Sequence, residues 1–383
     1  MSTAITLEVL PARFGDCLLV DCHRNGERPW RALIDGGPSD CWPRLRDRLL
    51  EIPSQNRHLD LVVVTHIDHD HIGGLLRFFE DFRQAVPGLT VGDVWFNGLA
   101  QLPDPDTGAA RSVTEGESLV ALLGGRDSGD ALPWNCAFGG AAVMTPDHGA
   151  FVESAVAAGP TLTVLSPTPK RLAILRRRWL AELDRLQRGV PSDEHEPALP
   201  LTPLSDLERL AAAATTNDAA PANGSSIVFL LEHQGASCLL GADAFPNVLG
   251  AALAGVAQAR GATSVPVDAF KLPHHASRAN VTATLAALAP AAHYVVSTNG
   301  DRFDHPDDEA LARVATLDER DVTLWFNYRN PRTERWDNPA LQQRYRFRTC
   351  YPPEGTDGVR LELPAHDDEA TLGRPGPNRE TTG

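Results

Sequence analysis

Residues 65–74 read THIDHDHIGG and concentrate three imidazoles and two carboxylates within six positions, His66 to His71. The segment follows the apolar run Leu59–Thr65, which is typical of a strand buried on both faces, and Gly73 begins a pattern expected of a helix. In extended backbone, His66 and Asp68 project to the same side. Titratable groups at this density would be costly in a core unless a divalent cation neutralised them. The motif therefore predicts a metal site at a strand–helix junction, with a solvated polar loop as the alternative.

Two later apolar runs also end in polar side chains. Residues 238–243 read CLLGAD and end at Asp243, while residues 270–277 read FKLPHHAS and contain His274 and His275. Taken alone, Asp243 is a candidate turn residue or helix N-cap. The histidine pair alone indicates either a site or a hydrogen-bonded surface pair. Their order after residues 65–74 favours one shared site.

The composition is that of a globular protein with a sizeable core. The chain has 383 residues, of which 42% are hydrophobic and 22% charged, and its formal net charge is −15. This charge argues against a protein whose resting function is to coat nucleic acid or an anionic membrane. Nuclease activity remains an open alternative, because bound cations and a local basic patch can make the electrostatic potential at a site positive.

Cysteine usage and hydropathy indicate the cellular compartment of the protein. The six cysteines are scattered without a paired metal-ligand spacing, so free thiols are expected. The first residues lack the basic and apolar regions of a secretory signal. No stretch approaches the roughly 20 apolar residues of a membrane span. These features predict a cytoplasmic protein with no membrane part.

Strand-like segments alternate with helical ones through both halves of the chain, which suits two sheets packed face to face with helices outside. One domain is expected over residues 1–363, with a mobile insertion at 188–222 and a disordered tail at 364–383. Residues 98–160 are rich in Gly and Asp and are hard to assign. The expected strands are Ile5–Leu10, Cys17–Cys22, Trp30–Ile34, Leu59–Thr65, Val94–Asn97, Leu162–Leu165, Ser226–Leu231, Ser237–Leu240, Ala269–Leu272, Tyr294–Ser297, Val322–Tyr328 and Gln343–Thr349. Helices are expected near residues 43–51, 117–124, 170–187, 245–258, 280–289 and 307–316.

These motifs together resemble the metallo-β-lactamase superfamily, and most of all its branch with the nuclease-like domain of the competence protein ComEC and phosphorylcholine esterases. That branch has THxDxDHxGG where most of the superfamily has HxHxDH, so Asp68 takes the second histidine's place. Weaker motifs fit in the expected order: LPA at 10–12 with GD at 15–16, LIDGG at 33–37, NGSS at 223–226 and FDHP at 303–306. The resemblance spans residues 5 to about 310. It implies an α/β protein with an αββα sandwich of two packed mixed sheets and helices outside.

The resemblance also implies a cofactor, which is one or two divalent ions, Zn or Mn. Two such ions can activate water and polarise a phosphoryl oxygen. The implied metal ligands are His66 and Asp68 on the first ion, Asp70 and His71 on the second, Asp243 between the two, and His274 completing the second.

Catalytic roles follow from the same resemblance. Asp70 belongs to the reacting centre, and His275 and His305 would face the substrate as acid or as phosphate-binding groups. Asp35 would be a structural residue near the site. His305 precedes Pro306, which favours an extended loop, and an unperturbed pKa near 6.5 would suit it to proton transfer.

The sequence departs from the family pattern in one important respect. Many relatives supply a further histidine to the first metal from the segment before the bridging aspartate. Here that segment offers His148, in a stretch that is hard to assign, and His195, in the expected insertion. The first metal site would therefore be ligand-poor, weak or completed by water. Ala276 replaces the glycine that usually follows the paired histidines.

The expected helix at 170–187 is rich in cations. It is either a solvated helix face or a track for a phosphodiester backbone. As a track, it would contact a nucleic-acid substrate through Lys170, Arg171, Arg176, Arg177 and Arg178.

Three functions from different classes remain open. The leading one is a metal-dependent phosphodiesterase, in particular a nuclease. The second is a hydrolase of a small ester: a phosphorylcholine-type diester, a cyclic nucleotide or a lactone. The third is a non-catalytic subunit that keeps the fold and binds a partner protein, and a regulatory partner also remains open for an enzyme. A long basic groove would favour a polymer, and a closed pocket a small ester.

Overall fold

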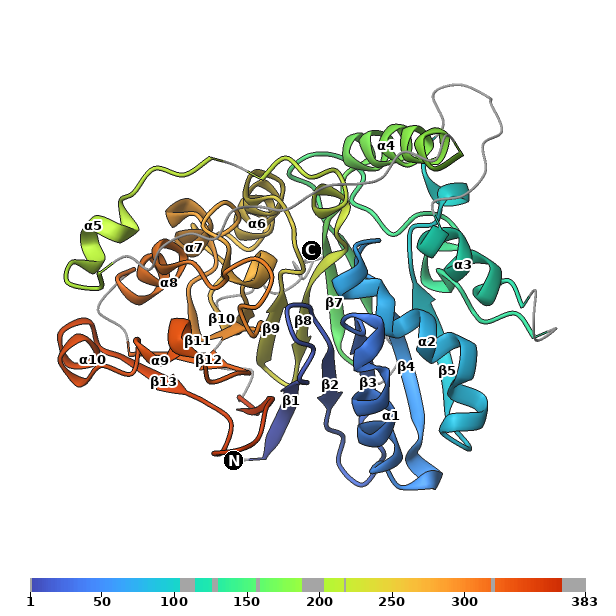
Figure 1. The fold of residues 1–383 in the computed structure, drawn as a ribbon, viewed down its shortest axis with the longest axis horizontal. Coiled ribbons are helices and arrows are strands. Elements are labelled where there is room, and N and C mark those ends of the chain that lie inside the picture. Colours follow the sequence, from blue (N-terminus) through green and yellow to red (C-terminus); the bar gives the residue numbers. More distant parts are fainter. Residues whose placement is uncertain are drawn as a thin grey trace, which may run out of the picture.

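Two mixed β-sheets lie face to face, and helices cover the outer face of each sheet, as Figure 1 shows. The structure is a computed structural model that describes residues 2–103, 114–125, 130–155, 159–187, 203–216, 218–317 and 321–366. The arrangement confirms the αββα sandwich expected from the sequence. In Figure 1, α1, α2 and α3 lie on one side of the strands, and α6, α7 and α8 lie on the other. The helices are α1 (Trp42–Leu50), α2 (His69–Ala85), α3 (Thr114–Leu123), α4 (Pro169–Gln187), α5 (Leu207–Ala211), α6 (Pro246–Ala259), α7 (Ala283–Leu288), α8 (Asp308–Ala315), α9 (Pro331–Glu334) and α10 (Pro339–Tyr345).

The first sheet consists, in spatial order, of β14 (Val359–Pro364), β1 (Thr3–Val9), β2 (Leu18–Cys22), β3 (Trp30–Ile34), β4 (His58–Val63) and β5 (Thr90–Trp95). Neighbours from β14 to β3 are antiparallel, and β3, β4 and β5 are parallel. Because β3 and β4 run in the same direction, the segments after them leave the same edge of the sheet. Those segments contain Asp35 and His66.

The second sheet consists, in spatial order, of β13 (Phe347–Cys350), β12 (Val322–Phe326), β11 (Ala291–Val296), β10 (Val267–Lys271), β9 (Ala236–Leu240), β8 (Val228–His233), β7 (Thr161–Ser166) and β6 (Val152–Ala155). Strands β13 to β9 are parallel, and the pairs from β9 to β6 are antiparallel. Asp243 after β9 and His274 after β10 therefore leave one edge together.

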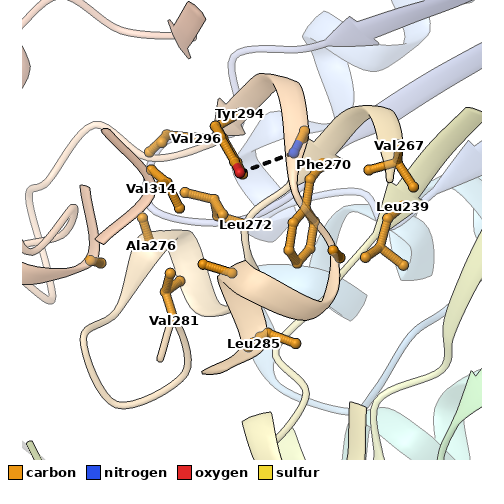
Figure 2. Packing of buried hydrophobic residues seen from close by; sticks show 14 of the residues in the cluster. Leu239, Val267, Phe270, Leu272, Ala276, Val281, Leu285, Tyr294, Val296 and Val314 are labelled. Carbon is orange, nitrogen blue, oxygen red and sulfur yellow. Dashed lines mark hydrogen bonds between the residues drawn. The ribbon is translucent and has the colours of Figure 1, made fainter. Parts of the chain in front are cut away.

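Alternating side chains of the strands fill two different apolar layers. Ala269 and Val295 join the cluster between the two sheets, whereas Phe270 and Tyr294, one position away, join the cluster beneath the outer helices. Successive strand residues point to opposite faces, so each buried strand serves both layers. Figure 2 shows the outer layer, where Phe270 and Leu285 pack together and Ala291 N donates a hydrogen bond to the Tyr294 hydroxyl (3.0 Å).

Two elements near the C-terminus differ from expectation. The strand expected at Gln343–Thr349 is wrong in its first part, because α10 extends to Tyr345 and β13 begins only at Phe347. The Asn338 side chain accepts from the first-turn N–H groups of α10, and Pro339 occupies the first turn. Strand β14 was not expected at all, yet it pairs with β1 from Val359 to Pro364 and completes the first sheet.

The segment 188–222 was expected to be a mobile insertion, and residues 188–202 lie outside the described residues. The described part contains α5, whose Leu207 and Leu210 are buried in the core beside α8. Arg313 of α8 donates to the carbonyl oxygens of Ala211 and Ala213 (3.2 and 2.8 Å). This part of the segment is packed against the domain. Of the expected tail, residues 367–383 lie outside the described residues.

Membrane insertion of a helix finds no support in the described ranges, where none of the helices combines the length and apolar character that crossing a bilayer requires.

Glycines allow α2 to begin against the loop after β3. A Cβ atom on Gly74 would lie 2.0 Å from Gly36 O, and Gly74 N donates to Gly37 O (2.7 Å). Even the smallest side chain would therefore separate these two backbone segments.

We expect Gly74→Ala to lower the free energy of unfolding by about 1–3 kcal/mol or more, because overpacking forces the backbone apart. Gly250→Ala in α6 is the matched control, since its Cβ would meet Leu288 Cδ1 at 3.4 Å and alanine favours helix. Urea denaturation measures both variants. A Gly74→Ala protein as stable as the wild type would contradict the tight approach.

Candidate metal centre

The polar segments after β4, β9 and β10 meet where the two sheets face each other. His66 follows β4, and α2 begins at His69 rather than at Gly73 as expected, so Asp70 and His71 lie in its first turn. Asp68 occupies the N-cap position in extended conformation. The motif therefore spans the end of a strand and the first turn of a helix, as its composition predicted.

The Asp243 carboxylate lies at the centre of four imidazoles. Its Oδ2 is 3.9 Å from His66 Nε2, 3.4 Å from His71 Nε2, 3.8 Å from His274 Nε2 and 3.8 Å from His275 Nε2. Asp243, His66, His71 and His275 are buried, while 22% of the His274 side chain is exposed. Four ring nitrogens from distant parts of the chain thus point at one carboxylate oxygen.

Two further carboxylates adjoin this cluster. Asp70 Oδ2 lies 3.4 Å from His275 Nε2 and 3.9 Å from His71 Nε2. Asp68 Oδ2 lies 3.7 Å from His66 Nε2, and 46% of the Asp68 side chain is exposed. Asp70 therefore belongs to the buried part of the cluster, and Asp68 to its rim.

Hydrogen bonds on the outer ring nitrogens orient three of the imidazoles. His275 Nδ1 is 2.7 Å from Ser297 O and must donate to it, since a carbonyl oxygen only accepts. His71 Nδ1 is 2.8 Å from Asp35 Oδ2, and His274 Nδ1 is 2.9 Å from Asn280 Oδ1. With Nδ1 as the donor, the neutral rings present the Nε2 lone pair to Asp243. Outer partners of this kind are typical of metal-binding histidines.

His66 is oriented through Thr65. The Thr65 hydroxyl donates to Asp35 Oδ2 (2.7 Å), so its oxygen is left to accept from His66 Nδ1 at 2.9 Å. The buried Asp35 also accepts from Thr65 N (2.8 Å), and its backbone has a positive φ of 57°. One carboxylate thereby orients His66 and His71 together, which agrees with the structural role expected for Asp35.

Burial and neighbouring charge shift the pKa values of the cluster in opposite directions. Burial lowers the pKa of His66 to about 3, and the adjacent His71 adds to this effect. Burial also opposes the charged form of His71 and His275, but nearby carboxylates outweigh it. Asp243 and Asp35 raise the pKa of His71 well above its usual value, and Asp243 with Asp16 raises that of His275 to about 9.

The unpartnered atoms of the cluster fit a divalent cation. Within the described part of the chain, His66 Nε2, His71 Nε2, His275 Nε2 and Asp243 Oδ1 are buried without a hydrogen-bond partner. Buried polar atoms are rarely left without partners. Three sets of ligand atoms among the described residues are close enough to share an ion: His66–His71–Asp243, Asp70–His71–His275 and Asp16–Asp35–His71. The first two contain the unpartnered Nε2 atoms, whereas Asp16 and Asp35 already bind Lys271 and Thr65. Imidazole and carboxylate donors suit Zn²⁺ and Mn²⁺.

The structure brings His275, rather than His274, beside Asp70 and His71. The sequence had assigned His274 to that position and His275 to the substrate side. His274, His275 and Ala276 have positive φ angles of 50°, 52° and 66°, and the two imidazole centroids are 5.9 Å apart. Left-handed backbone over three residues without glycine is unusual and is held in place by its surroundings. It sends one ring into the buried cluster and leaves the other at its partly exposed side.

His305 lies next to the histidine pair. Its ring centroid is 5.3 Å from that of His274, and its buried Nδ1 has no hydrogen-bond partner in the described ranges. Burial, and then the neighbouring His274 and His275, lower the pKa of His305 well below 6.5. The neutral form therefore prevails at pH 7, which revises the expectation of an acid with an unperturbed pKa.

Neither of the two histidines that could have supplied a further ligand to the first metal is shown at the cluster. His148 is exposed and lines a cavity at the start of α4. His195 lies outside the described residues.

Sequence reasoning missed a buried ion pair behind His275. Lys271 is fully buried, and its Nζ donates to Asp16 Oδ2, while Asp16 Oδ1 lies 3.4 Å from His275 Nδ1. Burial opposes ionisation of Asp16, but Lys271 and His275 lower its pKa below the usual range. A lysine inside the apolar run 270–272 was the signal that could have identified this pair.

The cations expected to form a nucleic-acid track do not all share one environment. Lys170 and Arg171 line a cavity, and Arg176 Nη1 donates to Leu99 O (3.0 Å). Arg177 and Arg178 are exposed. These two lie seven residues beyond Lys170 and Arg171 on the same helix face, about 10.5 Å along α4.

Comparison with known proteins agrees with the fold. Residues 11–300 match the family model described as the metallo-beta-lactamase superfamily. No curated protein matches the sequence. The chain is similar to a solved structure described as a new diphosphatase from the PhnP family, with 13% sequence identity and a TM-score of 0.38 over 94% of this chain and 98% of that chain.

We expect the purified protein to contain one or two divalent ions per chain, and Asp243→Asn to lose most of them, because Asp243 contacts all four imidazoles. Asp268→Asn is the matched control, since Asp268 lies at the start of β10 and binds Ser237 instead (2.8 Å). Elemental analysis of both variants is the measurement. Metal retained in Asp243→Asn, or absent from wild type and not taken up from added Zn²⁺ or Mn²⁺, would contradict the assignment.

We expect metal affinity to rise with pH between about 6 and 9. The raised pKa values of His71 and His275 mean that the metal-free site holds protons at neutral pH, and a cation must displace them. Each displaced proton increases affinity up to tenfold per pH unit. Competition with a chelator measures the slope, which His275→Ala should reduce. An affinity independent of pH would show that these rings are already neutral.

Proposed function

Because the chain belongs to the metallo-beta-lactamase superfamily, whose members are mostly metal-dependent hydrolases, we propose that it hydrolyses phosphodiesters with one or two divalent ions. The observation that supports this most directly is the convergence of four imidazole Nε2 atoms on Asp243 Oδ2, at 3.4 to 3.9 Å. A non-catalytic subunit would have no need of so many buried unpartnered donors. The alternative of a pure partner-binding subunit is therefore disfavoured.

The ligands divide into two groups around Asp243. We assign Asp70, His71 and His275 to one ion, since their ligand atoms lie within reach of one another. The other ion would be held by His66 and Asp68, with His274 on the exposed side. In this assignment His274 takes the place of the further histidine that relatives supply. Three carboxylates in the set make Mn²⁺ a candidate beside Zn²⁺.

A bound divalent cation would supply Lewis-acid stabilisation of phosphoryl charge and would increase the acidity of water at the site. The chain's own residues supply orientation and proton transfer. Asp35, Asn280 and the Ser297 carbonyl hold the imidazole rings in the tautomer that exposes Nε2. His305 is neutral and lies against His274, so it can donate a hydrogen bond to a phosphoryl oxygen and accept a proton.

The substrate class is argued from the basic residues of α4. Lys170 and Arg171 at the cavity are continued along the helix by Arg177 and Arg178, which favours a substrate with several phosphates, such as DNA or RNA. A small diester is the second candidate, because the formal net charge of −15 disfavours a polyanionic substrate. The motif of the ComEC-type branch, with Asp68 in the second histidine's place, agrees with either diester.

The proposal is tested by assaying the metal-loaded protein against bis-p-nitrophenyl phosphate, plasmid DNA, RNA and a lactone, with Zn²⁺ and Mn²⁺ in turn. Hydrolysis of the synthetic diester and of DNA or RNA is the expected result. Turnover of the diester alone would favour the small substrate. Turnover of the lactone alone would overturn the phosphodiesterase proposal.

We expect His305→Gln to lower kcat by about 10²–10⁴ without loss of metal, since one group that assists proton transfer contributes about that much. His275→Ala should instead lose metal and activity together, because its Nε2 points into the buried cluster. Turnover and metal content are measured in parallel for both variants. Metal lost from His305→Gln, or unchanged turnover in that variant, would remove His305 from the catalytic role.

A further inference from the structure

A cavity beside the candidate metal centre has features of an anion site. Its volume is about 680 Å³, and three segments enclose it: the loop before β6, the start of α4 and the start of α6. The lining residues are Pro146, Asp147, His148, Thr168, Pro169, Lys170, Arg171, Asn247 and Val248.

Strand topology places this cavity at the same sheet edge as Asp243. Strands β7 and β9 are both antiparallel to β8, so they are parallel to each other and end at one edge. Neighbouring strands are about 4.8 Å apart, so the ends of β7 and β9 are separated by about 10 Å. Helix α4 begins three residues after β7 ends, and α6 begins three residues after Asp243. A substrate at the metal centre can therefore extend into the cavity.

Arg171 connects the cavity with the metal centre. Its guanidinium lies over the Phe245 ring, 4.5 Å from the centroid, and Phe245 is two residues beyond Asp243. The side chain is half-buried, and burial lowers its pKa. No carboxylate of the described residues forms an ion pair with Arg171. The Asp218 carboxylate lies close enough to act on the charge of Arg171, but it accepts hydrogen bonds from Asn223 and Asn280 instead of forming an ion pair with it. A half-buried guanidinium stacked on an aromatic ring, with no ion pair among the described residues, is suited to bind a phosphate.

The surrounding groups add to a positive field. Lys170 is exposed at the cavity and, like Arg171, has no ion pair within the described ranges. The cavity also meets the N-termini of two helices of 19 and 14 residues, whose dipoles favour an anion. Both helices begin with a proline, and Arg171 N and Val248 N donate to Thr168 O (3.0 Å) and Phe245 O (3.1 Å), so the dipoles and not free N–H groups supply this contribution. The one acidic lining residue, Asp147, accepts a hydrogen bond from His148 N (2.6 Å). Among the described residues, two cations and two helix ends therefore stand against the lining carboxylate of Asp147 and the nearby carboxylate of Asp218.

We propose that this cavity binds a second phosphate group of the substrate, next to the phosphodiester that is hydrolysed at the metal centre. The identity of the ligand rests on the proposed phosphodiesterase function. The presence of the anion site does not. The cavity would make the enzyme favour substrates with at least two phosphates over a simple diester.

The first test measures binding without turnover. Inorganic phosphate is titrated into the metal-loaded protein by calorimetry, with wild type compared to the double variant Lys170→Gln/Arg171→Gln. We expect the double variant to lose one phosphate-binding event, or to bind it about 10- to 100-fold more weakly, as removal of hydrogen bonds to charged groups does. Equal stoichiometry and affinity in the two proteins would overturn the proposal.

The matched control is Arg83→Gln. Arg83 also stacks on a phenylalanine, with its guanidinium 4.9 Å from the Phe82 centroid, but at the opposite end of its helix from the metal centre. It should bind phosphate as the wild type does. Thermal unfolding and metal content of each variant show whether the fold is intact. A loss of phosphate binding in Arg83→Gln equal to that of the double variant would overturn the assignment to the cavity.

The second test distinguishes phosphate binding at the cavity from hydrolysis at the metal centre. KM is compared for a dinucleotide with and without a terminal phosphate. In the wild type, the dinucleotide with a terminal phosphate should have the lower KM. The double variant should raise this KM by about 10- to 100-fold relative to the KM of the unphosphorylated dinucleotide. An unchanged ratio would overturn the proposal. If neither dinucleotide is hydrolysed by wild type, the proposed function fails, and the phosphate titration alone decides the cavity.

Discussion

The buried Asp243 carboxylate, surrounded by four imidazoles, is the interaction on which the arrangement of the molecule depends. His66 and His71 follow a strand of the first sheet, whereas Asp243, His274 and His275 follow strands of the second. The cluster therefore forms only when both sheets are packed in one relative position. The buried charges oppose that packing, pairing of imidazolium with carboxylate groups offsets part of the opposition, and a bound cation would offset more of it. A ligand set that needs both sheets would couple folding to metal binding.

Close backbone contacts hold the ligands of the first sheet and those of the second sheet in place. A Cβ on Gly15 would lie 1.9 Å from Asp70 O, so the loop between β1 and β2 lies directly against the first turn of α2. The Ser297 hydroxyl, at the end of β11, donates to Gly15 O (2.9 Å). The buried pair of Lys271 and Asp16 joins the same loop to β10. One short loop thereby touches the ligands from both sheets.

Local sequence patterns were sufficient to predict those elements whose structure depends on their own residues. The apolar runs at β4, β9 and β10 ended at the predicted polar groups, because a strand buried on both faces must be apolar throughout its length. The sequence pattern did not predict an element whose structure depends on pairing with a distant strand. Strand β14 has alternating exposed and buried residues from Val359 to Pro364, and only its pairing with β1 distinguishes it from a surface segment. Likewise, Pro339 and the Asn338 cap start a helix where the apolar residues resembled a strand.

By itself, the sequence determined, through hydrophobic periodicity, which residue types gather at the end of each strand. Its motifs resembled the metallo-β-lactamase superfamily, and that resemblance implied the αββα architecture. The tertiary structure alone decided how the adjacent His274 and His275 divide. In a regular strand neighbouring side chains point to opposite faces, but positive φ angles at 274, 275 and 276 turn both rings toward Asp243, and only His275 becomes fully buried. The same holds for His305, whose environment and not its residue type lowers its pKa. Burial and neighbouring charge are properties of the packed molecule, and no spacing along the chain encodes them.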